Sequence, residues 1–147
     1  MRSFLLKNKS PIVKWGLIPD GVMYQGKIPE VYNLAISPTP GIIIVDVDVD
    51  IEKNKNGFEN IPHNLLKELE TTFNYSTKRG GKHYWLKYTG TKHLGNKTSN
   101  KSIDLRTEKG YVVYWHTEPI ENCLGRIKET SEQLNEWIEG LFCYKVK

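Results

Sequence analysis

Three aspartates at every second position end a run of β-branched residues, Gly41-Ile-Ile-Ile-Val-Asp-Val-Asp-Val-Asp50. Side chains of a strand alternate between its faces, so Asp46, Asp48 and Asp50 are predicted to project from one face. The Cα atoms of neighbouring same-face residues lie about 6.5–7 Å apart. Because clustered carboxylates repel one another, we expect them to share divalent cations, Mg²⁺ or Mn²⁺. The alternative is a strand that runs out of the core into a solvated, acidic turn.

A histidine and several basic residues form a second candidate group. His83 follows two glycines in Gly80-Gly-Lys-His83, and Arg79 and Lys82 lie beside it. Residues 77–109 contain nine basic and two acidic residues, a net charge of +7 in a chain whose formal net charge is +4. A basic segment that accompanies an acidic metal-type site indicates a polyanionic ligand, either nucleic acid or a nucleoside triphosphate. The segment is also compatible with a solvated, lysine-rich surface.

A further carboxylate lies in Ser102-Ile-Asp-Leu-Arg106. The alternation of this segment predicts that Asp104 and Arg106 lie on the same side of a strand. Arginine suits phosphate groups because its planar fork can make two parallel hydrogen bonds. Asp104 is therefore either a third metal-binding carboxylate or the partner of Arg106 in an ion pair.

The elements that must position these groups are predicted to be mainly strands. Alternating or β-branched patterns predict strands over 32–37, the aspartate-bearing run, 82–88, 102–106 and 111–116. The turn-rich segments 37–41 and 108–110 are expected to join the first two and the last two of these strands as hairpins. In the strand over 82–88, His83, Trp85 and Lys87 are expected to share a face. Trp85, Tyr111 and Trp115 are predicted either to pack in the core or to stack on bases.

Two amphipathic helices are also predicted. Asn60 is expected to cap the first, with Pro62 in its first turn, and its apolar residues are Ile61, Leu65, Leu66, Leu69 and Phe73. Thr130 and Gln133 resemble a capping box for the second helix, whose apolar residues are Leu134, Trp137, Ile138, Leu141 and Phe142. The segments 1–33, 52–57, 74–81 and 89–101 are expected to be dominated by turns and loops.

The composition favours one globular domain over residues 1–147, which is long enough to bury a core. Charged residues are plentiful without a low-complexity tract, which argues against disorder. The longest apolar run, Ile42 to Val45, is too short to cross a membrane. Cys123 and Cys143 form neither a disulfide framework nor a metal-type pair, so a reducing cytoplasm is the expected location.

Three motifs occur in a fixed order: Asp46-Val-Asp48 after an apolar strand, Gly81-Lys-His83 before an aromatic strand, and Ile103-Asp104 before a turn. In order and local pattern they resemble the catalytic domain of the archaeo-eukaryotic primase superfamily. The closest likeness is to the bifunctional DNA primase/polymerase (prim-pol) domain of plasmids and phages. The resemblance covers about residues 30–117.

The resemblance implies an α+β fold, in which an RRM-like, largely antiparallel sheet is flanked by helices. It implies that Asp46, Asp48 and Asp104 are catalytic ligands of two divalent ions and that His83 contacts the phosphates of the incoming nucleotide. Gly81 takes the position of a small residue that is often serine in relatives. Arg106, Arg79 and Lys82 lie near the motifs and are candidate nucleotide-binding residues, whereas Asp50 receives no role from the family.

The activity that the resemblance implies is template-dependent nucleotidyl transfer, with nucleoside triphosphates, a single-stranded DNA template and a primer as partners. Relatives usually carry further helical or helicase domains that help to start a primer, so primer extension is expected more than initiation by this chain alone. Two alternatives remain: a non-catalytic module that binds single strands, and a metal-dependent nuclease. The paired-histidine motif of rolling-circle nickases is absent, since His83 and His116 each stand singly.

Overall fold

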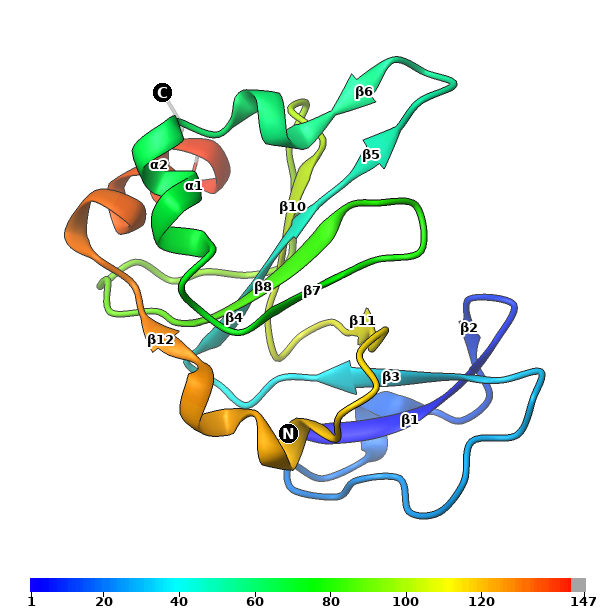
Figure 1. Cartoon of the computed structure of the whole chain (residues 1–147). Coiled ribbons are helices and arrows are strands. Elements are labelled where there is room, and N and C mark those ends of the chain that lie inside the picture. Colours follow the sequence, from blue (N-terminus) through cyan, green and yellow to red (C-terminus); the bar gives the residue numbers. More distant parts are fainter. Residues whose placement is uncertain (144–147) are drawn as a thin grey trace.

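The computed structural model describes residues 1–143 and contains two main sheets, one small two-stranded sheet and two α-helices (Figure 1). One main sheet has the strand order β11-β3-β1-β2. The other has the order β12-β8-β4-β10-β9, with β7 paired to β8. The strands are β1 (Arg2–Lys7), β2 (Ser10–Pro11), β3 (Asn33–Ser37), β4 (Ile42–Val47), β5 (Val49–Asp50), β6 (Lys55–Asn56), β7 (Asn74–Ser76), β8 (Lys82–Lys87), β9 (Lys97–Thr98), β10 (Ile103–Arg106), β11 (Val112–Val113) and β12 (Lys128–Glu129). The helices are α1 (His63–Leu69) and α2 (Glu132–Phe142).

The sheet that carries β4 is covered differently on its two faces. Helices α1 and α2 lie together on one face, where their apolar side chains pack with Val45 and Val47 of β4 (Figure 1). On the opposite face Ile44 and Trp85 pack against Ile36 and Val112 of the other main sheet. The alternation of β4 therefore sends Val45 and Val47 towards the helices, and Ile44 and Asp46 towards the other side. The predicted α+β class, with a largely antiparallel sheet flanked by helices, is confirmed.

Both predicted hairpins are wrong. Strand β3 pairs with β1 and β11, and β10 pairs with β4 and β9. The segment between β3 and β4 ends at Gly41, which has a φ of 94° that glycine adopts without strain, and it carries the chain from one sheet into the other. The strand expected over 111–116 is reduced to Val112–Val113, which pairs with β3 and not with β10.

All four segments that are predicted to be turns or loops contain strands, including β9 in the segment 89–101. Strand β1 pairs with β3 over five residues and buries Ser3 to Leu6. The aspartate run is not one continuous strand: β4 ends at Val47, and Val49–Asp50 form β5, which pairs with β6 in the segment predicted as a loop over 52–57. Strand β7 adds to β8 at the segment expected as a loop over 74–81. Polar residues dominate the sequences of β6 and β7, and pairing with a neighbouring strand orders both of them.

The starts of both helices differ from the prediction. Helix α1 begins at His63 after Pro62, and the side-chain amide of Asn60 instead donates a hydrogen bond to the Lys101 carbonyl at 3.0 Å. Helix α2 is capped by Ser131, whose hydroxyl accepts a hydrogen bond from the N–H of Leu134 at 3.1 Å. A serine in this position satisfies an N–H that has no partner within the helix.

Two residues assigned to the helices have other roles. Thr130, one residue before the cap of α2, is hydrogen-bonded to Thr89. Phe73 lies beyond α1 and packs between the two main sheets. Among residues 1–143, no helix is long and apolar enough to cross a membrane.

Candidate active site

The register of three neighbouring strands brings the central residues of all three motifs into one row. Asp104 of β10 lies opposite Asp46 of β4, and Asp46 lies opposite His83 of β8. Residues directly opposite one another in antiparallel strands share a face, with Cβ atoms about 4.5–5.5 Å apart. Segments separated by about 60 residues in the sequence therefore place two carboxylates and an imidazole side by side.

His83 is held on both of its ring nitrogens. Its Nε2 lies 3.3 Å from Oδ1 of Asp46, and its Nδ1 lies 3.0 Å from the hydroxyl of Tyr75, which is opposite His83 in β7. The His83 side chain is buried, whereas the Asp46 side chain keeps 26% of its surface exposed. The sequence patterns do not identify Tyr75, because Asn74-Tyr-Ser lies in a segment predicted as a loop; an aromatic ring between two polar residues is the signal that this segment offers.

Asp104 forms the ion pair with Arg106 that was one of its two predicted roles, at 3.2 Å. It also stands in the row with Asp46; its other predicted role, as a third metal-binding carboxylate, stays a prediction. Burial raises the pKa of Asp104 above its usual value, and the charges of Asp46 and Asp48 raise it further, while Arg106 and the backbone N–H of Ser99 oppose the shift. Because burial is the largest cause, the raised pKa shows that the Asp104 carboxylate loses more hydration than Arg106 compensates.

Asp48 lies where the chain passes from β4 into β5. Its N–H donates to the Ser102 carbonyl and its carbonyl accepts from the N–H of Gly57, both at 2.9 Å. Its side chain is half exposed and lies 3.5 Å from Arg79. Arg79 is equally far from Asp50, whose side chain is largely buried, so the guanidinium bridges these two carboxylates. Arg79 thus lies at the acidic site, as its place in the sequence suggested.

Two glycines hold the backbone at Val47 and Asp48 by close approach. A Cβ atom on Gly81 would lie 2.1 Å from the Val47 carbonyl oxygen, and one on Gly57 would lie 2.3 Å from the Ser102 carbonyl oxygen. Any side chain at either position would force the backbone apart. In this chain, main-chain packing beside Asp48 therefore accounts for the glycine at position 81.

Lys82 does not join the row. It precedes His83 in β8 and so faces the helices, where its ammonium group pairs with Glu70 at 2.8 Å. Trp85 is fully buried and so is not free to stack on bases, and the half-buried Tyr111 packs against Phe4 and Trp15. Trp115, at 37% exposure, is the most exposed of the three candidate aromatics.

A different cluster of side chains brings three possible metal-ligand atoms close together. Within residues 1–143, only His116, Glu118 and Cys123 offer three ligand atoms that all lie within 4.8 Å of one another. Arg126 already donates to Glu118 at 2.7 Å and to the Cys123 sulfur at 2.9 Å, so a positive charge occupies this cluster.

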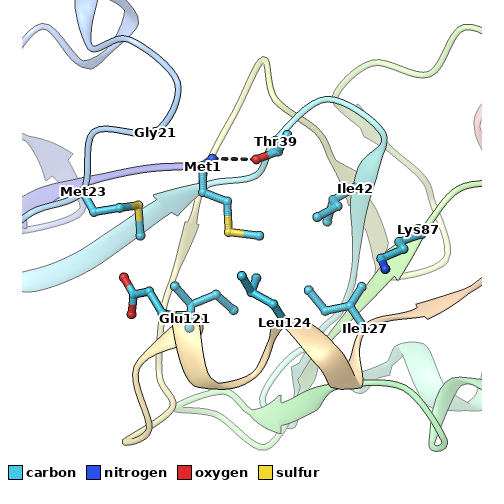
Figure 2. A pocket seen from close by; sticks show the side chains of 10 residues that line it. Met1, Gly21, Met23, Thr39, Ile42, Lys87, Glu121, Leu124 and Ile127 are labelled. Carbon is cyan, nitrogen blue, oxygen red and sulfur yellow. Dashed lines mark hydrogen bonds between the residues drawn. The ribbon is translucent and has the colours of Figure 1, made fainter.

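An apolar pocket of about 380 Å³ lies away from the row (Figure 2). Met1, Met23 and Leu124 contribute to its wall, together with Ile42 and Lys87. Ile42 and Lys87 pair with each other at the end of β4 and β8 that is opposite to Asp46 and His83. The pocket is therefore separate from the candidate site.

Comparison with known families gives one match. A family model described as "Bifunctional DNA primase/polymerase, N-terminal" (Prim-Pol) matches residues 8–136. This range includes every residue of the row and all of the sheet that carries it. No curated protein matches the chain.

Proposed function

This chain belongs to the bifunctional DNA primase/polymerase family, and we propose that it is a template-dependent nucleotidyltransferase that joins nucleotides to a primer or nascent strand. The family predicted from the three motifs is thereby confirmed. Its substrates are then nucleoside triphosphates and DNA. We further propose that it serves replication of a phage, plasmid or mobile element, and that a helical accessory domain or a helicase helps it to start primers, as in the relatives that the sequence resembles.

The row of Asp104, Asp46 and His83 is the observation that carries this proposal. The donor set is made of carboxylate oxygens, which suit hard divalent cations. Burial is the main cause of the raised pKa of Asp104, and a bound cation would stabilise the ionised form of this desolvated carboxylate. We propose that Asp46, Asp48 and Asp104 hold two Mg²⁺ or Mn²⁺ ions, which when bound activate the attacking 3′-hydroxyl and stabilise the leaving pyrophosphate.

The basic groups of the site are proposed to bind the triphosphate. Arg106 and Arg79 now contact carboxylates, at 3.2 Å and 3.5 Å, and both side chains keep some solvent exposure. A triphosphate offers the same bidentate acceptor geometry as a carboxylate, with more negative charge. His83 adds a donor next to Asp46. Lys82 is left out of this proposal because Glu70 holds it on the other face.

Primer extension tests the proposal directly. Labelled deoxynucleotides and ribonucleotides are incubated with the protein, Mg²⁺ or Mn²⁺ and a single-stranded template, with and without an annealed primer. We expect primer extension by the wild type and only background incorporation by an Asp46→Asn/Asp48→Asn variant and by Asp104→Asn. Asp50→Asn is the matched control, since this acid lies on the same run but has no ligand role in the proposal, and it is expected to retain extension.

Circular dichroism confirms that each variant is folded before its activity is compared. Full extension by a folded Asp46→Asn/Asp48→Asn protein would refute the assignment. Metal-dependent shortening of a labelled template in the same reactions would identify a nuclease instead. Template binding without metal-dependent chemistry would identify a binding module.

A further inference from the structure

We propose that Tyr75 and Trp85 are positioning residues that fix the tautomer of His83, so that the neutral imidazole carries its proton on Nε2 and directs it to the Asp46 side. Nothing in the three sequence motifs assigns a role to either aromatic residue. The tautomer itself depends only on the contacts described below. Its use in binding a nucleotide phosphate rests on the proposed function.

The direction of each hydrogen bond follows from which groups can only donate. The indole Nε1–H of Trp85 has no acceptor capacity and lies 3.2 Å from the Tyr75 hydroxyl oxygen, so the oxygen accepts this bond. The hydroxyl has one proton of its own, and Nδ1 of His83 lies 3.0 Å away. The hydroxyl therefore donates to Nδ1, which must be the unprotonated nitrogen. A neutral imidazole then carries its single proton on Nε2.

Burial disfavours the reverse arrangement. Trp85 is fully buried, and Tyr75 and His83 are 6% and 5% exposed, so water does not replace these partners. If Nδ1 carried the proton, the Tyr75 oxygen would receive two donors and its own proton would need another acceptor. Within residues 1–143, the hydroxyl has no hydrogen-bond partners other than these two rings. A buried donor left without an acceptor disfavours that tautomer by about ten-fold or more.

Aromatic packing holds the Tyr75 ring in place. It meets His83 edge-on at 5.3 Å between ring centroids, stacks on His116 at 5.8 Å and meets Tyr114 edge-on at 5.2 Å. Burial also raises the pKa of Tyr75, and the nearby Asp46 charge raises it further, which keeps the hydroxyl protonated and able to donate. The relay from Trp85 through Tyr75 to His83 is therefore rigid and has one direction.

The consequence is that the neutral form of His83 presents its N–H donor at the edge of the acidic site. Nε2 of His83 lies 3.3 Å from Oδ1 of Asp46, on the face that Asp46 and Asp104 share. A donor fixed in this direction can bind an anion that approaches Asp46 without rotation of the ring. Tyr75 and Trp85 would thus act on substrate binding only through His83.

Nitrogen NMR of ¹⁵N-histidine-labelled, metal-free protein reads the tautomer directly, because protonated and unprotonated ring nitrogens have well separated resonances. The spectrum is recorded at about pH 8.5, above the usual range of imidazole titration. A His83→Gln sample assigns the signals among the four histidines. We expect His83 of the wild type to be protonated on Nε2, with Nδ1 as an acceptor. A wild-type His83 protonated on Nδ1 would overturn the proposal, whether or not any variant folds.

Variants separate the relay from the acceptor on the other side of the ring, because Asp46 also favours a proton on Nε2. In Asp46→Ala the relay remains, so His83 is expected to keep the wild-type tautomer. In Asp46→Ala/Tyr75→Phe the population with a proton on Nδ1 is expected to rise about ten-fold or more. Asp46→Ala/Tyr114→Phe is the matched control, since Tyr114 contacts the Tyr75 ring but not His83, and the tautomer should not change.

An unchanged tautomer ratio in Asp46→Ala/Tyr75→Phe relative to Asp46→Ala would also overturn the proposal. None of these spectra involves a nucleotide, so the tautomer can be established even if primer extension is never observed. If both the tautomer and the proposed function are established, Tyr75→Phe should raise the KM for the nucleotide, whereas Tyr114→Phe should leave the KM near the wild-type value. An unchanged KM in Tyr75→Phe would contradict the positioning role.

Discussion

Replacing Gly81 by alanine tests whether close backbone packing positions the acidic site. The added Cβ would lie 2.1 Å from the Val47 carbonyl oxygen and 3.1 Å from the Thr77 hydroxyl oxygen. Carbon–oxygen contacts in proteins are about 3.3 Å or longer, so the two backbones must separate by about 1 Å. Gly81 has an ordinary φ, so the effect of the substitution is steric and does not arise from a lost glycine conformation.

The expected cost follows from the surroundings of Val47. Val47 is fully buried against the helices, and forcing extra atoms into a well-packed interior costs about 1–3 kcal/mol. For a domain of this size each 1 kcal/mol lowers the unfolding temperature by about 2–4 °C. Gly81→Ala should therefore lower the midpoint of thermal unfolding by about 2–12 °C. Because Asp48 follows Val47, metal-dependent primer extension should fall as well.

Thermal unfolding followed by circular dichroism measures the change. Gly125→Ala is the matched control, since its φ is also ordinary and a Cβ there would meet no atom within 4 Å; its stability should change by less than about 0.5 kcal/mol. Gly57→Ala should behave like Gly81→Ala, because its Cβ would lie 2.3 Å from the Ser102 carbonyl oxygen. A Gly81→Ala protein that unfolds within about 1 °C of the wild type would refute the reasoning.

Three further substitutions probe the charges and the helix cap. The folded-state pKa of Asp104 is raised, so its ionised carboxylate destabilises the metal-free protein above that pKa, and the effect disappears in acid, where the carboxyl group is protonated in both states. Asp104→Asn should therefore unfold at a higher temperature than the wild type at neutral pH, with a smaller difference in acid. The variant should also lose stabilisation by Mn²⁺. The opposite order at neutral pH would contradict this. Arg79→Ala should change stability by less than about 1 kcal/mol, since the ion pairs of Arg79 are 3.5 Å long and its side chain is exposed. The same variant should raise the KM for the nucleotide in primer extension. An unchanged KM would show that Arg79 does not bind the nucleotide. Ser131→Ala should cost about 1 kcal/mol, or about 2–4 °C in a thermal melt, through loss of the cap on Leu134, and no change would mean that the cap is redundant.

The strands that carry the motifs could be predicted because their patterns are local. The β-branched run over Ile42–Val47 and the alternation over 82–87 and 103–106 specify strands and the face of each side chain. Asp104 and Arg106 share a side as predicted, and so do His83 and Trp85. Within a strand, the period of two is sufficient to place a residue on a face.

The pairing of strands could not be predicted in the same way. Both hairpin predictions assumed that strands adjacent in sequence pair with each other, but β3 and β11 belong to one sheet while β4 and β10 belong to the other. The choice is made by long-range burial: Ile36 of β3 and Val112 of β11 pack against Ile44 across the space between the sheets. No local pattern encodes which of two apolar strands a third will join.

Tyr75 illustrates the same limit within the site. Its neighbours Asn74 and Ser76 are polar, so the segment has the composition of a loop. The segment becomes a strand because β8 offers it a free edge, with Tyr75 opposite His83. The residue that completes the environment of the motif histidine is therefore defined by pairing and not by its own sequence.

The register of the row is fixed from the opposite face of the sheet. Leu105, Val45 and Tyr84 are the next residues along β10, β4 and β8; they lie opposite one another, and each is fully buried under the helices. Slipping one strand by a single residue would turn this buried set outward and bring Asp46 or His83 under the helices, where a charge has no partner. The hydrophobic core thus aligns the two carboxylates and the imidazole without contacting them. A substitution that weakens the core on the helix side, far from any ligand atom, should accordingly impair the site through register rather than through chemistry.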